Sequence, residues 1–201
     1  QFGVGVSGGS ELLVHAARAL VAERPDWLIV GTDCRNAFNS GSRRGMLAAL
    51  ALAGSDILPF AQFFYGQDAA LFFGAEDGVA RLASRTGAQQ GDPIAPFLFS
   101  LLIQPVLEEL QATAVGDAEG ARVLAYLDDV YLVGPRAWVE ACYARMRVAY
   151  AALGLELRDD KGVVYSPHGI DRRQTVRVAR RHADGTTTHV AIDATLGVPV
   201  A

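Results

Sequence analysis

Apolar residues with helical spacing and short apolar runs alternate along the chain. A helix is expected over residues 11–23, with Ser10 as its cap. The apolar run at residues 27–30 indicates a buried strand, which delivers Asp33 at its C-terminal end. A second helix is expected over residues 42–53. The first quarter of the chain therefore predicts helix, strand and helix, with an aspartate where the strand ends.

The middle of the chain predicts a hairpin between two further helices. The helices are expected over residues 57–65 and 93–112. Between them, two apolar runs flank the turn residues Glu76-Asp77-Gly78, which indicates a hairpin over residues 69–84.

The last third of the chain adds a second hairpin, a helix and short strands. Apolar runs at residues 123–126 and 130–133 flank Leu127-Asp128-Asp129, so two carboxylates are expected at the tip of a hairpin. A helix over residues 135–153 follows, and Ala183-Asp184-Gly185 indicates a further turn. The order of elements predicts an α+β domain, with helices on one face of a mostly antiparallel sheet.

Composition excludes several classes of protein. The chain has 201 residues, of which 51% are hydrophobic and 20% charged, which suffices for a domain with a core and differs from a disordered tail. Its two cysteines, Cys34 and Cys142, are too few for a disulfide scaffold or a four-thiolate zinc site. No apolar stretch is long enough to span a bilayer core of about 30 Å, so no membrane partner is expected.

The net charge of −4 argues, at first sight, against a nucleic-acid partner. The charge is uneven, however, because residues 158–182 contain seven Arg or Lys and three Asp. The segment Arg172–Arg181 suits a contact with nucleic acid and a solvated hairpin equally well. Net charge alone therefore does not decide the class of partner.

Three aspartates fall where strands are expected to end, namely Asp33, Asp128 and Asp129. Clustered carboxylates repel one another unless a cation neutralises them. Oxygen ligands suit Mg²⁺ or Mn²⁺, and two such ions about 3.5–4 Å apart can activate a hydroxyl and stabilise a leaving phosphate. Taken alone, Asp-Asp is also ordinary turn chemistry, but here it interrupts two apolar strands.

The loop Thr86–Pro93 leads directly into an apolar helix. Its glycines allow the backbone to pass close to a ligand, and Gln90 offers an amide to a base or a sugar. Taken alone, the loop is more simply interpreted as the start of a helix.

Together these stretches resemble reverse transcriptases, most closely those of non-LTR retrotransposons. The resemblance rests jointly on three motifs, Asp33-Cys34-Arg35-Asn36-Ala37-Phe38-Asn39, Gly87-Ala88-Gln89-Gln90-Gly91-Asp92-Pro93-Ile94-Ala95-Pro96 and Ala125-Tyr126-Leu127-Asp128-Asp129. Weaker matches are Gln1-Phe2-Gly3 with Gly8-Gly9, Gly154-Leu155 with Lys161, and Leu196-Gly197-Val198-Pro199. The resemblance implies the palm of a right-hand polymerase over residues 1–201.

The resemblance also implies catalytic roles. Asp33 and Asp128 would bind two Mg²⁺ or Mn²⁺ ions, and Asp129 would complete the cluster. The main-chain carbonyl of Cys34 would add a ligand, with its thiol incidental. Lys161 would neutralise or protonate the departing pyrophosphate, although a solvated loop lysine is an equal alternative.

Further positions are implied to contact the substrates, which would be an RNA template, a DNA primer and a dNTP. Phe38 matches the aromatic residue under the incoming sugar, where a flat ring excludes a 2′-hydroxyl. Gln90 and Gly91 would pack against nucleotide and template. Leu196 and Gly197 match the primer grip. The expected reaction is attack of a primer 3′-hydroxyl on the α-phosphate of a dNTP.

Three alternatives stay open at this point. An RNA-dependent RNA polymerase shares the palm, but usually has a carboxylate where Phe38 stands. An inactive palm-like scaffold that binds RNA or protein would not need all three aspartates. An unrelated metal-dependent hydrolase would leave Phe38 and the Gln90-Gly91 loop without a role.

The chain begins at Gln1 rather than at a methionine, so a fragment of a longer polymerase is expected. Most of the fingers would lie upstream and the thumb downstream, and the fragment alone is expected to be inactive as a polymerase. An intracellular location is expected, in the nucleus if the element is eukaryotic.

Overall fold

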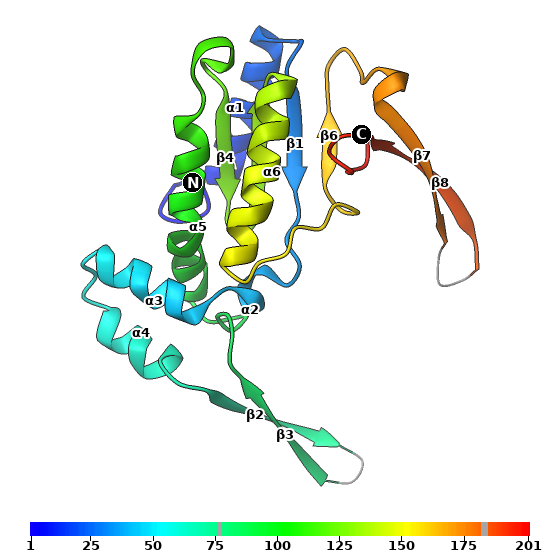
Figure 1. The fold of residues 1–201 in the computed structure, drawn as a ribbon. Helices are drawn as coiled ribbons and strands as arrows, with labels where there is room; N and C mark the ends of the chain where they lie inside the picture. The colour runs from blue at the N-terminus through cyan, green and yellow to red at the C-terminus, as the bar shows by residue number, and fades with distance from the viewer. Residues whose placement is uncertain (76–77, 182–184) are drawn as a thin grey trace.

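The computed structural model describes residues 1–75, 78–181 and 185–201 (Figure 1). The helices are α1 (Gly9–Glu23), α2 (Ala37–Ser40), α3 (Arg43–Leu52), α4 (Leu58–Tyr65), α5 (Ala95–Ala112) and α6 (Arg136–Ala152). The strands are β1 (Leu28–Thr32), β2 (Ala69–Ala75), β3 (Gly78–Ser84), β4 (Arg122–Tyr126), β5 (Asp129–Gly134), β6 (Val163–Tyr165), β7 (Thr175–Arg181) and β8 (Thr187–Asp193). Short 3-10 turns lie at Gly116–Ala118 and Arg172–Gln174.

The central sheet has the strand order β4-β5-β1-β6, and the ladders between its strands are antiparallel. Val30 of β1 and both Val130 and Leu132 of β5 are fully buried. Such β-branched and aliphatic side chains favour strands that are covered by other elements. The two central strands therefore form the rigid middle of the molecule.

Helices cover both faces of this sheet. α5 and α6 pack against each other and against β4 and β5, whereas α1 contacts the same strands from behind in the view of Figure 1. Phe99 and Ile103 of α5 and Met146 of α6 are fully buried in this core. The expected α+β palm with an antiparallel sheet is confirmed. The sequence predicted helices on one face of the sheet only, whereas α1 covers the other face.

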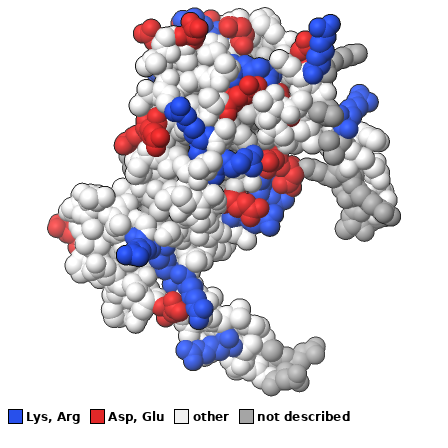
Figure 2. All heavy atoms as spheres, in the orientation of Figure 1, with Lys and Arg blue, Asp and Glu red and all other residues white. Residues whose placement is uncertain are grey.

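Two hairpins project from this body, β2–β3 and β7–β8 (Figure 1). The β2–β3 hairpin and the neighbouring α4 expose large apolar side chains, including Phe63 (73% exposed), Phe72 (68%) and Val79 (74%). Basic side chains gather over α3 and this hairpin on the face drawn in Figure 2. We call α4 with β2–β3 the arm.

Two helix starts differ from the expectation. Ser10 lies inside α1 instead of capping it, and the cap position is the left-handed Gly8, which makes no side-chain cap. α5 begins at Ala95 rather than at Pro93. The side chain of Asp92 accepts a hydrogen bond from the backbone N–H of Ile94 at 3.0 Å, which holds a turn ahead of the helix.

Some expectations concern residues outside the described part of the chain. The turn residues Glu76, Asp77, Ala183 and Asp184 lie there, as do several side chains of the segment Arg172–Arg181. Among the helices that the structure describes, none combines the length and apolar character that crossing a membrane requires. The predicted nucleic-acid contact of Arg172–Arg181 stays a prediction.

Candidate active site

The pairing of β1 with β5 and of β4 with β5 brings the three aspartates to one end of the sheet. Thr32 pairs with Val130 at the end of this ladder; Asp33 directly follows Thr32, and Asp129 directly precedes Val130. Tyr126 pairs with Asp129, which leaves Leu127 and Asp128 as a two-residue turn. Tight turns of this kind favour a left-handed residue, and Leu127 adopts a φ of 57°.

The three carboxylates interact electrostatically. Partial burial raises the pKa of Asp129, and the negative charges of Asp128 and Asp33 raise it further. No set of three or more His, Cys, Asp or Glu side chains among the described residues is close enough to hold a metal ion by itself. The site is therefore a region of uncompensated negative charge rather than a complete protein cage for a cation.

Cys34 follows Asp33 and forms an isolated antiparallel bridge with Leu157. The backbone bonds around this bridge run from the Arg158 N–H to the Asp33 carbonyl and from the Arg35 N–H to the Glu156 carbonyl, both 2.8 Å. The Cys34 carbonyl is not used by the bridge. Burial raises the pKa of the Cys34 thiol to about 11, so the thiol stays protonated and unreactive near neutral pH.

The segment after this bridge places Lys161 on the surface, exposed, in the turn before β6. A different cation, Arg158, is joined to Asp33 by its backbone, since its N–H donates to the Asp33 carbonyl. Its side chain pairs with Asp160, which is the main cause of its raised pKa, and the charge of Asp33 adds to the effect. The sequence pattern counted Arg158 only as part of a basic segment, because nothing local signals that its backbone joins the strand end at Asp33.

Phe38 and the glutamine–glycine loop line one cavity of about 300 Å³, together with neighbouring residues of the loop and of α5. The cavity-lining residues are Phe38, Gln89, Gln90, Gly91, Asp92, Ala95 and Pro96. The Phe38 ring is half-buried and packs on Phe99, with ring centroids 4.9 Å apart. The structure therefore brings Phe38, Gln90 and Gly91 together around one cavity, while their roles in binding a nucleotide stay a prediction.

The loop reaches this position because Gly87 passes directly over the backbone that follows Phe38. A Cβ at Gly87 would lie 2.3 Å from the Phe38 carbonyl oxygen, and its φ is 64°, so only glycine fits there. The Ala88 N–H donates to that same carbonyl at 2.7 Å, and the Gly87 N–H donates to the Gly41 carbonyl at 2.7 Å. The segment at Phe38 and the loop at Gly87 and Ala88, which are about fifty residues apart in the sequence, thus lie directly against each other.

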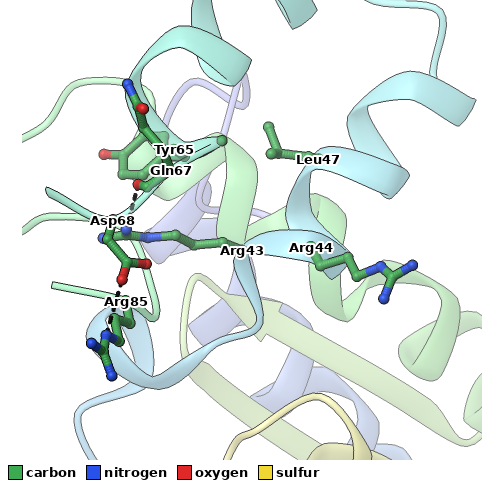
Figure 3. Close-up of a pocket in the computed structure, with 8 residues that line it drawn as sticks. Arg43, Arg44, Leu47, Tyr65, Gln67, Asp68 and Arg85 are labelled. Atoms are coloured by element: carbon green, nitrogen blue, oxygen red, sulfur yellow. Dashed lines mark hydrogen bonds and ion pairs between the residues drawn. The ribbon is translucent and has the colours of Figure 1, made fainter.

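Arg43 and Tyr65 support the loop from the side of α3 and α4 (Figure 3). Arg43 is 7% exposed, and its Nε donates to the Gly87 carbonyl at 2.8 Å. Tyr65 donates its hydroxyl to the side chain of Asp92 and accepts from the Gln89 N–H at 3.3 Å. Neither residue was singled out by the sequence, since their roles depend on the meeting of three distant segments.

The predicted primer grip lies in the turn after β8. Leu196 is buried, and Gly197 has a φ of 73°. The fully buried Asp193 accepts hydrogen bonds from the N–H groups of Thr195 and Leu196, each 3.0 Å, and pairs with Arg136 at 2.9 Å. The turn is therefore fixed to the first residue of α6.

Tyr150 of α6 is a buried residue that interacts electrostatically with Asp128. Its side chain is fully buried, and its hydroxyl has no hydrogen-bond partner among the described residues. Burial raises the pKa of Tyr150 strongly, and the negative charge of Asp128 raises it further. An orphaned buried hydroxyl is uncommon in folded proteins.

Known proteins have sequences similar to this chain. A family model described as reverse transcriptase (RNA-dependent DNA polymerase) matches residues 8–184. The Pol polyprotein of the type-1 retrotransposable element R2 of Popillia japonica is 29% identical over 119 residues, 55% of this chain and 17% of the relative. The SLACS 132 kDa protein of Trypanosoma brucei gambiense is 30% identical over 168 residues, 80% of this chain and 13% of the relative. The chain thus spans a small part of either relative.

Solved telomerases have a similar fold. The telomerase of Candida albicans, solved with a TWJ fragment of telomeric RNA, matches 92% of this chain with a TM-score of 0.61 and 11% identity, and 33% of that protein is covered. The apo telomerase of Candida tropicalis matches 97% of the chain with a TM-score of 0.62 and 9% identity, and 36% of that protein is covered. From its motifs, its fold and the family match over most of its length, the chain belongs to the reverse transcriptase family.

Proposed function

We propose that this chain is the catalytic palm of an RNA-directed DNA polymerase of a retrotransposon, which transfers nucleotides from dNTPs to a primer 3′-hydroxyl. The observation that supports this most directly is the strand register at the end of the sheet. Asp33 directly follows the last residue of β1 that pairs with β5, Asp129 is the first residue of β5, and Asp128 lies in the adjoining turn. A cavity lined by Phe38 and Gln90 belongs to the same end of the fold.

Reverse transcriptases generally use divalent metal ions, and the carboxylates at this site have the right donor chemistry for them. Asp33 and Asp128 would hold two such ions, with Asp129 and the Cys34 carbonyl beside them. The absence of a three-residue cage among the described residues suits Mg²⁺, which is usually bound by one or two carboxylates together with substrate phosphates. When bound, the ions would activate the primer hydroxyl and stabilise the leaving pyrophosphate.

The remaining residues would bind and orient the substrates. The Phe38 ring would lie under the sugar and exclude a 2′-hydroxyl, while Gln90 and Gly91 would contact the nucleotide and the template. Lys161 would move toward the pyrophosphate and neutralise or protonate it, and Leu196 with Gly197 would hold the primer end. Catalysis would then consist mainly of positioning and charge stabilisation.

Extension of a DNA primer on an RNA template tests this proposal. The assay uses the longest natural polypeptide that contains the chain, with dNTPs and Mg²⁺, and compares wild type with Asp128→Asn. We expect extension by the wild type and a loss of about a thousandfold in the variant. Asp117→Asn is the matched control, because Asp117 is exposed in the turn before β4 and should leave the rate unchanged.

Other outcomes would identify another function. Extension with ribonucleotides in preference to dNTPs would indicate an RNA-directed RNA polymerase. Nucleotide hydrolysis without extension would indicate a hydrolase. RNA binding without extension, together with equal Mn²⁺ binding by wild type and Asp128→Asn, would indicate a scaffold.

A further inference from the structure

We infer that Arg43, assisted by Tyr65, is a positioning residue that sets the shape of the nucleotide cavity from behind the glutamine–glycine loop. This inference rests on the proposed function of that cavity. Arg43 does not line the cavity, so it would act through the loop rather than by touching a substrate.

The Arg43 guanidinium joins three separate parts of the chain. Its Nε donates to the Gly87 carbonyl at 2.8 Å. Its Nη1 donates to the Ser84 carbonyl at 2.7 Å and to the Gln67 carbonyl at 3.3 Å, and its Nη2 donates to the Ser84 hydroxyl at 2.7 Å. These bonds tie α3 to the end of β3, to the segment just before β2 and to Gly87 of the loop.

These bonds use the fixed fork geometry of a guanidinium. No carboxylate of the described residues pairs with Arg43. Asp68 and Arg85, which line a second pocket together with Arg43 (Figure 3), pair with each other at 2.9 Å. The Arg43 donors are directed instead to carbonyl and hydroxyl oxygens in different directions. A lysine has one nitrogen, so it cannot reach Gly87 and Ser84 in the same way.

Tyr65 fixes the other half of the loop. Its hydroxyl lies between the side chain of Asp92 and the backbone N–H of Gln89, on either side of Gln90 and Gly91. The Arg43 guanidinium lies 5.4 Å from the centre of the Tyr65 ring, so the two supports contact each other. Burial and the bond to Asp92 raise the pKa of Tyr65 to about 12, so the hydroxyl keeps its proton.

The consequence for substrate choice follows from the contact between the loop and Phe38. Gly87 and Ala88 lie directly on the Phe38 carbonyl, so a shift of Gly87 changes the space between the loop and the Phe38 ring. That space is where the sugar would lie. Loss of the Arg43 bonds should therefore weaken nucleotide binding and sugar discrimination more than the chemical step, because the aspartates are positioned separately by β1 and β5.

Adjacent residues provide a matched test. Arg43→Lys is compared with Arg44→Lys, because Arg44 is exposed and its side chain points away from Arg43 and Tyr65 in Figure 3. We expect Arg43→Lys to raise the KM for dNTP about tenfold and to lower discrimination against ribonucleotides, with a smaller change in kcat. Arg44→Lys should match the wild type in all three measurements.

Two further measurements separate positioning from loss of folding. Tyr65→Phe removes a single hydroxyl and should also raise the KM for dNTP. Amide hydrogen exchange of Gly87, Ala88 and Gln89 should accelerate in Arg43→Lys while exchange in β1 and β5 stays as in the wild type. This readout does not depend on activity.

Equal KM, sugar discrimination and loop exchange in the Arg43→Lys and Arg44→Lys enzymes would overturn the inference. A uniform loss of kcat with faster exchange throughout the chain would also overturn it, since that result means global destabilisation. An inactive wild type would instead contradict the proposed function, while faster loop exchange would still show that Arg43 holds the loop.

Discussion

Phe38 is held by its neighbours more firmly than a surface aromatic residue would be. Its ring packs on Phe99 in the core, and its carbonyl accepts a hydrogen bond from Ala88. Both the ring and the backbone of this residue are therefore fixed relative to the glutamine–glycine loop. Exclusion of a 2′-hydroxyl requires a rigid ring, because a mobile ring could move aside and leave room for the hydroxyl.

Replacing this ring with a smaller side chain tests its role in sugar selection. In the complete polymerase, Phe38→Val should raise incorporation of ribonucleotides relative to deoxynucleotides by about tenfold or more, because it opens space under the sugar. The measurement is the ratio of kcat/KM for rNTP and dNTP. Phe97→Val, a half-buried phenylalanine of α5 that does not line the cavity, is the control. Unchanged selectivity would refute the assignment of Phe38 as the gate.

The orphaned hydroxyl of Tyr150 gives a prediction about stability. A buried polar group without a partner costs free energy, so Tyr150→Phe should leave the free energy of unfolding unchanged or raise it by about 1 kcal/mol. Chemical denaturation of the chain measures this. A clear loss of stability would mean that the hydroxyl has a partner in solution, such as a buried water near Cys34 and Asp128.

At the scale of elements, α6 holds two loops through buried or half-buried carboxylates. Arg136, at its start, pairs with Asp193, and Tyr143 donates to Asp159 at 2.8 Å two turns later. Asp193 ends β8 just before the turn that carries the predicted primer grip, and Asp159 belongs to the loop before β6. Helix α6 thus also orders the turn after β8 and the loop before β6.

Loss of the Asp193 carboxylate should disrupt this arrangement. Asp193→Ala removes two hydrogen bonds donated by backbone N–H groups and one of the two carboxylate partners of Arg136, which keeps only Glu140, so it should lower the free energy of unfolding by about 3 kcal/mol. Urea denaturation checks the value. Asp68→Ala is the matched control, since its exposed pair with Arg85 should contribute less than about 1 kcal/mol. Similar small losses in both variants would contradict an organising role for Asp193.

At the scale of the whole molecule, stability comes from the body and not from the arm. The body buries large side chains such as Phe99 and Met146 completely, whereas the arm exposes Phe63 and Phe72. Exposed apolar side chains contribute little to folding, and a contiguous patch of them favours association.

The double variant Phe63→Ser and Phe72→Ser should therefore change the free energy of unfolding by less than about 1 kcal/mol and reduce the binding of a hydrophobic dye. Phe99→Ala in the body should instead cost about 3–5 kcal/mol. Urea denaturation and dye fluorescence provide the two measurements. A large loss of stability in the arm variant would show that the arm belongs to the core.

The sequence by itself determined the α+β class, most element boundaries, and the motifs that identify a reverse transcriptase. These are local properties, because apolar spacing defines strands and helices, and Leu127-Asp128-Asp129 defines a turn between two apolar runs. It also led to the grouping of Phe38 with Gln90, but only through the resemblance to a family.

Only the tertiary structure decided what holds these residues in place. The register of β1 on β5 brings the strand end before Asp33 beside the start of β5 at Asp129, and a buried Arg43 joins Gly87, Ser84 and Gln67. The proximity of Arg158 to Asp33 depends likewise on a bridge between distant segments. The partners in hydrogen bonds between distant segments cannot be predicted from the neighbouring sequence. A guanidinium or a strand edge can form its hydrogen bonds with any suitably placed oxygen or amide.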